Sequence, residues 1–148
     1  KARLPTPQDI EELVAFLPQI YAEGISPIKR WCGRSQGQDE VFTMPWPEYD
    51  ELIEKFFRVA ASKWWCDYDY HPEEAGRMLE NQEVVKTATL SQIKTMLTYC
   101  VRGERFCDGH WAAMIKGGHV RRLLERLAVL GSVNAQQGAP ADADKPRR

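Results

Sequence analysis

Apolar residues recur three or four positions apart over most of this chain, which is the spacing of helices that bury one face. The first such segment begins where Thr6 can cap a helix and Pro7 suits the first turn, and it stops at Gly24. Pro18 removes an internal hydrogen bond, so we expect this helix to bend or split there. The apolar face of the segment comprises Ile10, Leu13, Val14, Leu17, Ile20 and Tyr21.

Two further helices are predicted in the middle of the chain. Pro47 should open the first of them, because proline is favoured at the first helical position and an apolar stripe follows it. A shorter helix is expected from Pro72 to Glu80. The apolar stripe of the helix from Pro47 comprises Tyr49, Leu52, Ile53, Phe56, Ala60 and Trp64.

Capping residues mark the next two helices. Thr89 and Gln92 have the spacing of a capping box, and Gly103 should end the helix that they begin. Asp108 can cap a short helix that runs from Gly109 to Lys116. The residues of the longer helix that should face inward are Leu90, Ile93, Met96, Leu97 and Cys100.

The last helix should follow the break at Gly117 and Gly118 and end at Gly131. Residues 132–148 lack apolar periodicity and are expected to form a flexible tail, since they cannot bury enough apolar surface to offset the entropy of ordering. Residues 1–131 are then a single domain. The inward face of the last helix comprises Val120, Leu123, Leu124, Leu127 and Leu130, and its solvated face comprises Arg121, Arg122, Glu125 and Arg126.

Residues 25–45 show no helical period. Within them, Ile28–Trp31 and Glu40–Met44 flank the turn-forming Gly33–Gly37, a pattern that favours a small β-hairpin in residues 28–44. The predicted fold class is therefore all-α, with about five helices and this hairpin.

The composition argues against a membrane-spanning protein and against a disulfide-rich secreted one. The chain has 148 residues, of which 43% are hydrophobic, but no run of them is long enough to cross a bilayer. Its first residues lack the apolar core of a secretory signal. The four cysteines are widely spaced, which favours reduced thiols over a disulfide framework. We therefore expect a cytoplasmic protein that needs no cofactor.

Charge is distributed unevenly along the chain. Residues 1–85 hold 9 Lys and Arg against 16 Asp and Glu, a net charge of −7, whereas residues 86–148 have a net charge of +6. The basic half could bind nucleic acid, or the acidic half could mimic it, but complementary halves of one domain explain the asymmetry equally well. The basic residues available for phosphate contacts are Lys116, Arg121, Arg122 and Arg126.

The stretch from Val101 to Leu127 reads VRGERFCDGHWAAMIKGGHVRRLLERL. It resembles a bacterial and archaeal domain family of unknown function, whose signature is Arg-Phe-x-x-Gly-His near the C-terminus. In this chain the signature falls on Arg105, Phe106, Gly109 and His110. Weaker similarities extend the resemblance over roughly residues 40–130. The resemblance implies a common fold and brings no activity with it.

The main candidate site is an anion site. Arg102 and Arg105 are three residues apart and can present their guanidinium groups together, while the amides after Asp108 open a helix whose N-terminus favours negative charge. The acidic and aromatic residues 67–70 could form the other wall of a crevice. Alternatively, the two arginines are structural and pair with carboxylates, for which the candidates are Asp67, Asp69, Glu104 and Asp108.

Two other chemistries use the histidines of the same region. His110 and His119 could act as acid and base in a hydrolase or transferase, with Arg102 and Arg105 holding the substrate, although no nucleophile elbow or phosphate loop accompanies them. Cys107 and His110 are close enough to be zinc ligands, but their spacing matches no familiar zinc pattern.

A binding or interaction module is therefore the favoured interpretation, with a protein or a small anionic ligand as its partner. An enzyme that uses His110 and a nucleic-acid-binding or nucleic-acid-mimicking regulator are the alternatives. No membrane partner is expected. The residues predicted to contact the ligand are Arg102, Arg105, His110, His119, Asp67 and Asp69.

Overall fold

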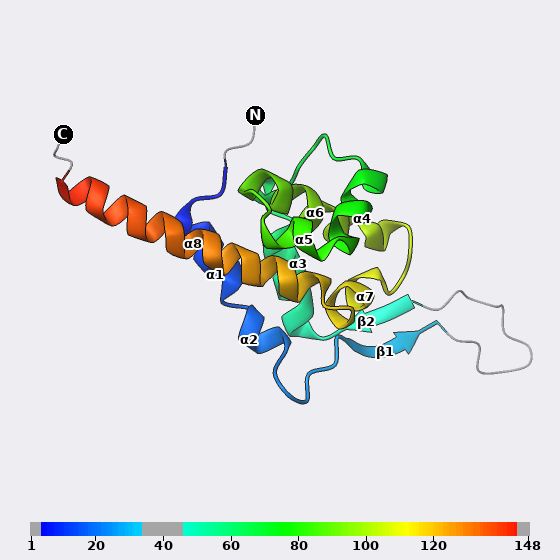
Figure 1. Ribbon diagram of the computed structural model, residues 1–148. Coiled ribbons are helices and arrows are strands. Elements are labelled where there is room, and N and C mark those ends of the chain that lie inside the picture. The colour runs from blue at the N-terminus through cyan, green and yellow to red at the C-terminus, as the bar shows by residue number, and fades with distance from the viewer. Residues whose placement is uncertain (1–3, 34–45, 145–148) are drawn as a thin grey trace, which may run out of the picture.

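The computed structural model describes residues 4–33 and 46–144, and of residues 133–144 it describes the backbone alone. The fold is mainly helical with one two-stranded antiparallel sheet, as predicted (Figure 1). In chain order the elements are α1 (Pro7–Val14), α2 (Leu17–Ile20), β1 (Ile28–Cys32), β2 (Trp46–Tyr49), α3 (Glu51–Ala60), the 3₁₀ turn η1 (Lys63–Trp65), α4 (Pro72–Glu80), α5 (Gln82–Lys86), α6 (Leu90–Arg102), the 3₁₀ turn η2 (Gly103–Arg105), α7 (His110–Lys116) and α8 (His119–Asp144).

Local capping fixes the starts of two helices where the sequence predicted them. Thr6 and Asp9 form a capping box at the start of α1, and the backbone N–H of Thr6 donates to Asp9 Oδ2 over 2.8 Å. Thr89 and Gln92 form the same motif at the start of α6. Pro18 lies in the first turn of α2, so the first predicted helix is indeed split into α1 and α2.

The hairpin confirms the strand predicted at Ile28, and it shows that Pro47 lies in a strand and not at the start of a helix. β1 begins at Ile28 as expected, but among the described residues its partner is β2, in which Pro47 lies opposite Trp31. The predicted strand Glu40–Met44 lies outside the described residues. The prediction that Pro47 opens a helix was wrong, because proline is also tolerated in an edge strand.

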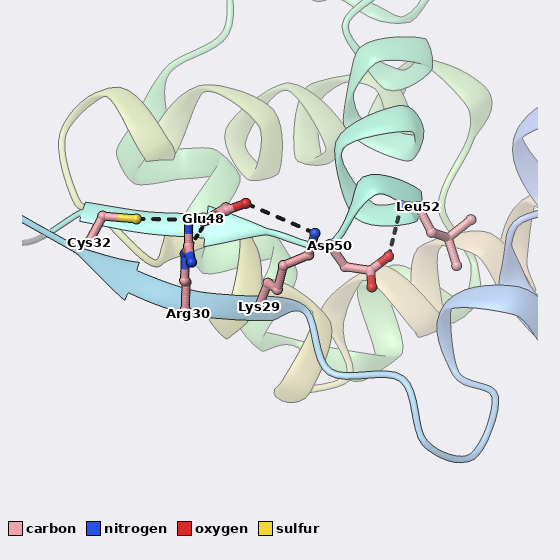
Figure 2. Close-up of polar contacts among 6 residues, drawn as sticks. All are labelled: Lys29, Arg30, Cys32, Glu48, Asp50 and Leu52. Carbon is pink, nitrogen blue, oxygen red and sulfur yellow. Dashed lines mark hydrogen bonds and ion pairs between the residues drawn. The ribbon is translucent and has the colours of Figure 1, made fainter.

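The helix after the hairpin begins at Glu51, and Asp50 is its N-cap. The Asp50 carboxylate accepts the backbone N–H of Leu52 over 2.8 Å (Figure 2). In the hairpin, Glu48 on β2 accepts hydrogen bonds from Arg30 and Cys32 on β1. The Glu48 contacts join β1 to β2, and the Asp50 cap begins α3 directly after the hairpin.

The core lies between α3, α6 and α8. The inward faces predicted for α6 and α8 are confirmed, except that Leu90 and Leu130 are half-buried. The stripe predicted to end at Trp64 stops earlier, since α3 ends at Ala60 and Trp64 lies in η1 beside the fully buried Trp65. The largest fully buried side chains include Trp65, Phe56, Phe57, Ile53, Met96, Leu97, Leu123, Leu124 and Leu127.

Helix α8 is longer than the sequence indicated. It runs through Gly131 to Asp144 and extends past the other helices (Figure 1), so the prediction that Gly131 ends it was wrong. A glycine inside a helix costs only about 1 kcal/mol. Gly131 also lets α1 approach closely, since a Cβ there would lie 3.2 Å from Ile10 Cγ2. The predicted flexibility of residues 132–148 stays a prediction.

Within the described parts of the chain, none of the helices combines the length and the apolar character that crossing a membrane would require.

Candidate functional site

A small crevice lies between residues 66–70 and the end of α6. The sequence predicted a crevice with residues 67–70 as one wall and the two arginines as the other. Its volume is about 110 Å³. Arg102 and Arg105 reach it from α6 and η2, and Tyr68 faces them from the other wall. We call it the Arg102 crevice; its lining residues are Ala60, Ala61, Cys66, Tyr68, Thr98, Val101, Arg102 and Arg105.

Aromatic rings and a thiol hold Arg102 in place. Its guanidinium carbon lies 5.5 Å from the centre of the Tyr70 ring and 5.9 Å from that of Tyr68, within the range of cation–π attraction. Its Nη2 donates to Cys66 Sγ over 3.2 Å. Arg105 is exposed. The position of the Arg102 guanidinium is therefore fixed without an acidic partner.

The predicted pairing of these arginines with carboxylates is not found. Among residues 4–33 and 46–132, whose side chains the structure describes, no carboxylate oxygen lies within 4 Å of a guanidinium nitrogen of Arg102 or Arg105. Unlike a buried charge, which must be paired, an arginine at the mouth of a crevice can keep its remaining donors for solvent or a ligand.

Asp67 has a structural role beside the crevice. Its Oδ1 accepts the backbone N–H of Asp69 over 3.0 Å, and its Oδ2 accepts the hydroxyl of Thr95 over 2.6 Å. The backbone N–H of Asp67 donates to Thr98 Oγ1 over 2.9 Å. These bonds fasten residues 67–69 to α6. Asp67 and the exposed Asp69 line another hollow of about 350 Å³, which includes Lys94 and shares Cys66 and Tyr68 with the Arg102 crevice.

The side-chain carboxylate of Glu104 lies at the start of α7. Glu104 Oε1 accepts the backbone N–H of Trp111 and the hydroxyl of Tyr49, both over 2.8 Å, and its Oε2 accepts the N–H of Gly109 over 2.9 Å. Burial and the hydrogen bond to Glu104 raise the pKa of Tyr49. The position proposed for a bound anion at this helix N-terminus is thus filled by Glu104.

Asp108 was wrongly predicted as the cap of α7. The N-cap is Gly109, whose φ of 90° lies in the left-handed region that favours glycine, and no side chain caps the helix from that position. Glu104 supplies the acceptors instead. The sequence contains no standard capping spacing that would have identified Glu104, because the carboxylate reaches the helix from η2, five residues before Gly109.

His110 packs against α6 and does not line the crevice. Its Nε2 lies 3.2 Å from the carbonyl oxygen of Tyr99, so this nitrogen carries a proton and donates. The ring rests on Gly103, where a Cβ would overlap it. Burial lowers the pKa of His110, with opposing contributions from the Tyr99 hydrogen bond and Glu104. This geometry is that of a hydrogen-bonded packing residue.

His119 lies at the start of α8, away from the crevice. Its Nδ1 is 3.1 Å from Arg122 Nη2, and because the guanidinium is a donor, this nitrogen accepts. Burial, and after it the charge of Arg122, lower the pKa of His119. The structure therefore places Arg102 and Arg105 together with Tyr68 but brings neither histidine into the same site.

The sequence also offered Cys107 and His110 as zinc ligands, and the described residues give them no third ligand. In the described parts of the chain, no three His, Cys, Asp or Glu side chains converge as metal ligands would. Cys107 is exposed, whereas Cys100 is fully buried, and burial raises the pKa of the Cys100 thiol to about 12.

The basic face of α8, which was considered for nucleic acid, is partly engaged within the protein. Arg121 Nε lies 3.4 Å from Glu125, and the Arg121 guanidinium lies over the ring of Tyr21. Arg126 Nε donates to the carbonyl oxygen of Ala88 over 2.9 Å.

The model of a family described as "Family of unknown function (DUF6508)" matches residues 5–132. The chain belongs to this family. The match covers the whole of the core and the Arg102 crevice of this DUF6508 domain. No curated protein and no solved structure matches the chain. The function of the DUF6508 domain must therefore be argued from its own residues.

Proposed function

We propose that this DUF6508 domain is a binding module that receives an anionic group in the Arg102 crevice. The observation that carries the proposal is the pair of arginines there, neither of which has a carboxylate partner among the described residues. Guanidinium groups match carboxylates and phosphates in shape and charge, and they bind them through paired hydrogen bonds.

Preorganisation supports this proposal. Arg102 is already held by Tyr68, Tyr70 and Cys66, so a bound anion would not need to order that side chain. Fixing a long side chain costs about 0.5–1.5 kcal/mol in a typical interface, and here the contacts within the domain have already offset much of that cost. Arg105 is exposed beside it and can move to complete the site.

The size of the crevice favours a group presented by a protein over a whole metabolite. Pockets for small molecules typically have volumes of about 300–1,000 Å³, whereas this one has about 110 Å³. One carboxylate or phosphate fits such a space. The exposed ring of Tyr68, 58% accessible, offers a partner an aromatic contact beside the charge. An acidic segment of a protein partner is the ligand that combines these features.

The geometry supports binding more than catalysis. A hydrolase or transferase built on Arg102 and Arg105 would need an acid or base that faces the same crevice. His110 instead donates to the Tyr99 carbonyl and packs on Gly103.

A titration followed by ¹⁵N NMR tests the proposal, with a hexaglutamate peptide and inorganic phosphate as separate probes at constant ionic strength. We expect shifts in the amide signals of Tyr68, Arg102 and Arg105, and the loss of those shifts in Arg105→Gln. Arg77→Gln is the matched control, because Arg77 is an exposed arginine on α4 that does not line the crevice. Equal binding by both variants, or no shift with either probe, would refute the proposal.

A further inference from the structure

Another hollow lies between α5 and α8 and shares no lining residue with the Arg102 crevice. Its volume is about 230 Å³. Figure 1 shows α5 beside α8, with the C-terminal part of α8 continuing past it. Arg122 and Val129 both line the hollow and are seven residues apart on α8, which corresponds to about 10 Å along the helix. We call this hollow the α5–α8 groove.

Part of the groove is apolar. Val85 contributes a buried side chain from α5, and Val129 contributes a side chain that is 49% exposed. Removal of apolar surface from water stabilises a complex. A ligand with an aliphatic portion would therefore gain from covering Val129.

The rest of the lining is positively charged. Lys86, Arg122 and Arg126 contribute three cations beside the neutral Gln82, and Lys86 is paired with Glu83 over 3.7 Å. Glu125 is the only acidic residue in the described lining, and it is engaged by Arg121 outside it. Arg126 is anchored through Nε to the Ala88 carbonyl, which leaves its two terminal nitrogens for another acceptor. Among the described residues, no carboxylate lies within 4 Å of the Arg122 or Arg126 guanidinium.

Arg122 has unused hydrogen-bonding capacity. Its Nε is buried and has no hydrogen-bond partner in the described parts of the chain, and its Nη2 contacts His119 Nδ1. An unsatisfied buried donor is unfavourable, and such groups are uncommon in native proteins unless they have a functional or structural reason. His119 keeps the guanidinium close to the helix without neutralising its charge. Arg122 is thus a half-buried cation that has no counter-ion among the described residues.

We propose that the α5–α8 groove binds a small carboxylic acid with a branched aliphatic tail. The carboxylate pairs with Arg122 and Arg126, and the tail packs on Val85 and Val129. A carboxylate suits two guanidinium groups, and the valines favour an apolar tail over a second charge. The groove is smaller than the roughly 300–1,000 Å³ of pockets for drug-sized molecules, so it suits a short acid. This site is independent of the Arg102 crevice.

The experiment uses 4-methylpentanoate as the probe, with 4-methylpentanamide as its neutral match and acetate as its match without a tail. In a ¹⁵N NMR titration of the full chain we expect 4-methylpentanoate to shift the amide signals of Val85 and Val129 with a Kd of about 1 mM, which is typical of a ligand of this size. The amide and acetate should each bind at least about tenfold more weakly.

Variants then assign the contacts. Arg122→Gln should weaken binding at least about tenfold, and Val129→Glu should do the same by placing a negative charge in the groove, whereas Arg58→Gln, an exposed change on α3, should leave it unchanged. Val129→Glu remains informative if Arg122→Gln fails to fold, because Val129 is half exposed. No shift at about 10 mM acid, equal binding of the amide or acetate, or shifts confined to Tyr68 and Arg105 would overturn the proposal.

Discussion

Removal of the Glu104 carboxylate is the most direct test of how this domain is held together. The carboxylate accepts three hydrogen bonds, from the Tyr49 hydroxyl and from the backbone N–H groups of Gly109 and Trp111, and thereby joins the hairpin to α7. Glu104→Ala leaves all three donors without this partner. An unsatisfied buried hydroxyl costs about 1–3 kcal/mol, and the loss of a helix cap typically costs about 1 kcal/mol.

We therefore expect Glu104→Ala to lower the free energy of unfolding by about 3 kcal/mol. Glu104→Gln retains one oxygen acceptor but turns an NH₂ group toward a donor, so we expect a loss of about 1–2 kcal/mol. Urea unfolding followed by circular dichroism measures both changes, and an unchanged m value would show that the unfolding transition remains comparable. Glu12→Ala, which removes an exposed carboxylate on α1, is the control and should change stability by no more than about 0.5 kcal/mol.

A double-mutant cycle with Tyr49→Phe isolates the longest-range of the three bonds. Tyr49 and Glu104 are 55 residues apart in sequence and 2.8 Å apart at their oxygen atoms, so a coupling energy of about 1 kcal/mol or more is expected. If Glu104→Ala costs no more than Glu12→Ala, or if the two changes are additive, Glu104 does not connect the hairpin to α7 and this account of the fold is refuted.

Packing predicts the effects of two further substitutions on stability, and the pKa values of two histidines predict how stability depends on pH. Gly103→Ala should destabilise the domain by about 1–3 kcal/mol, because the new Cβ overlaps the His110 ring; urea unfolding equal to that of the unmodified domain would contradict this. Leu123→Ala, in the core face of α8, should cost about 2–5 kcal/mol by the same measurement. Stability should fall as pH drops through about 6.5, since the folded domain lowers the pKa of His110 and His119 and the unfolded chain binds protons more readily; a flat urea midpoint between pH 7.5 and 5.5 would refute it.

The candidate site was only partly predictable from the sequence. The pairing of Arg102 and Arg105 in one crevice follows from their spacing, because residues three apart lie on the same side of a helical turn. Their lack of carboxylate partners among the described residues does not follow from it, since Glu104 and Asp108 lie nearby in sequence and only the fold places the Glu104 carboxylate at the start of α7. The inclusion of His110 and His119 in the site stays unsupported by the geometry, because the His110 ring contacts α6 and the His119 ring contacts Arg122 within α8.

Local sequence determined the features that depend on a few adjacent residues. The capping boxes at Thr6 and Thr89, the split at Pro18 and the apolar faces of α6 and α8 each arise from contacts within about one turn of helix. Such contacts form in the same way whatever the rest of the chain does. Periodicity was therefore sufficient to predict that the fold is mainly helical.

Tertiary structure decided the features for which local signals were ambiguous or absent. A proline such as Pro47 suits both a helix start and an edge strand, and pairing with β1 selected the strand. Gly131 permits a helix to end or to continue, and α8 continues where α1 packs against it. Glu104 became the acceptor for α7 because folding brought Tyr49 and Gly109 to it. Local propensities typically differ by about 1 kcal/mol, which long-range packing readily exceeds.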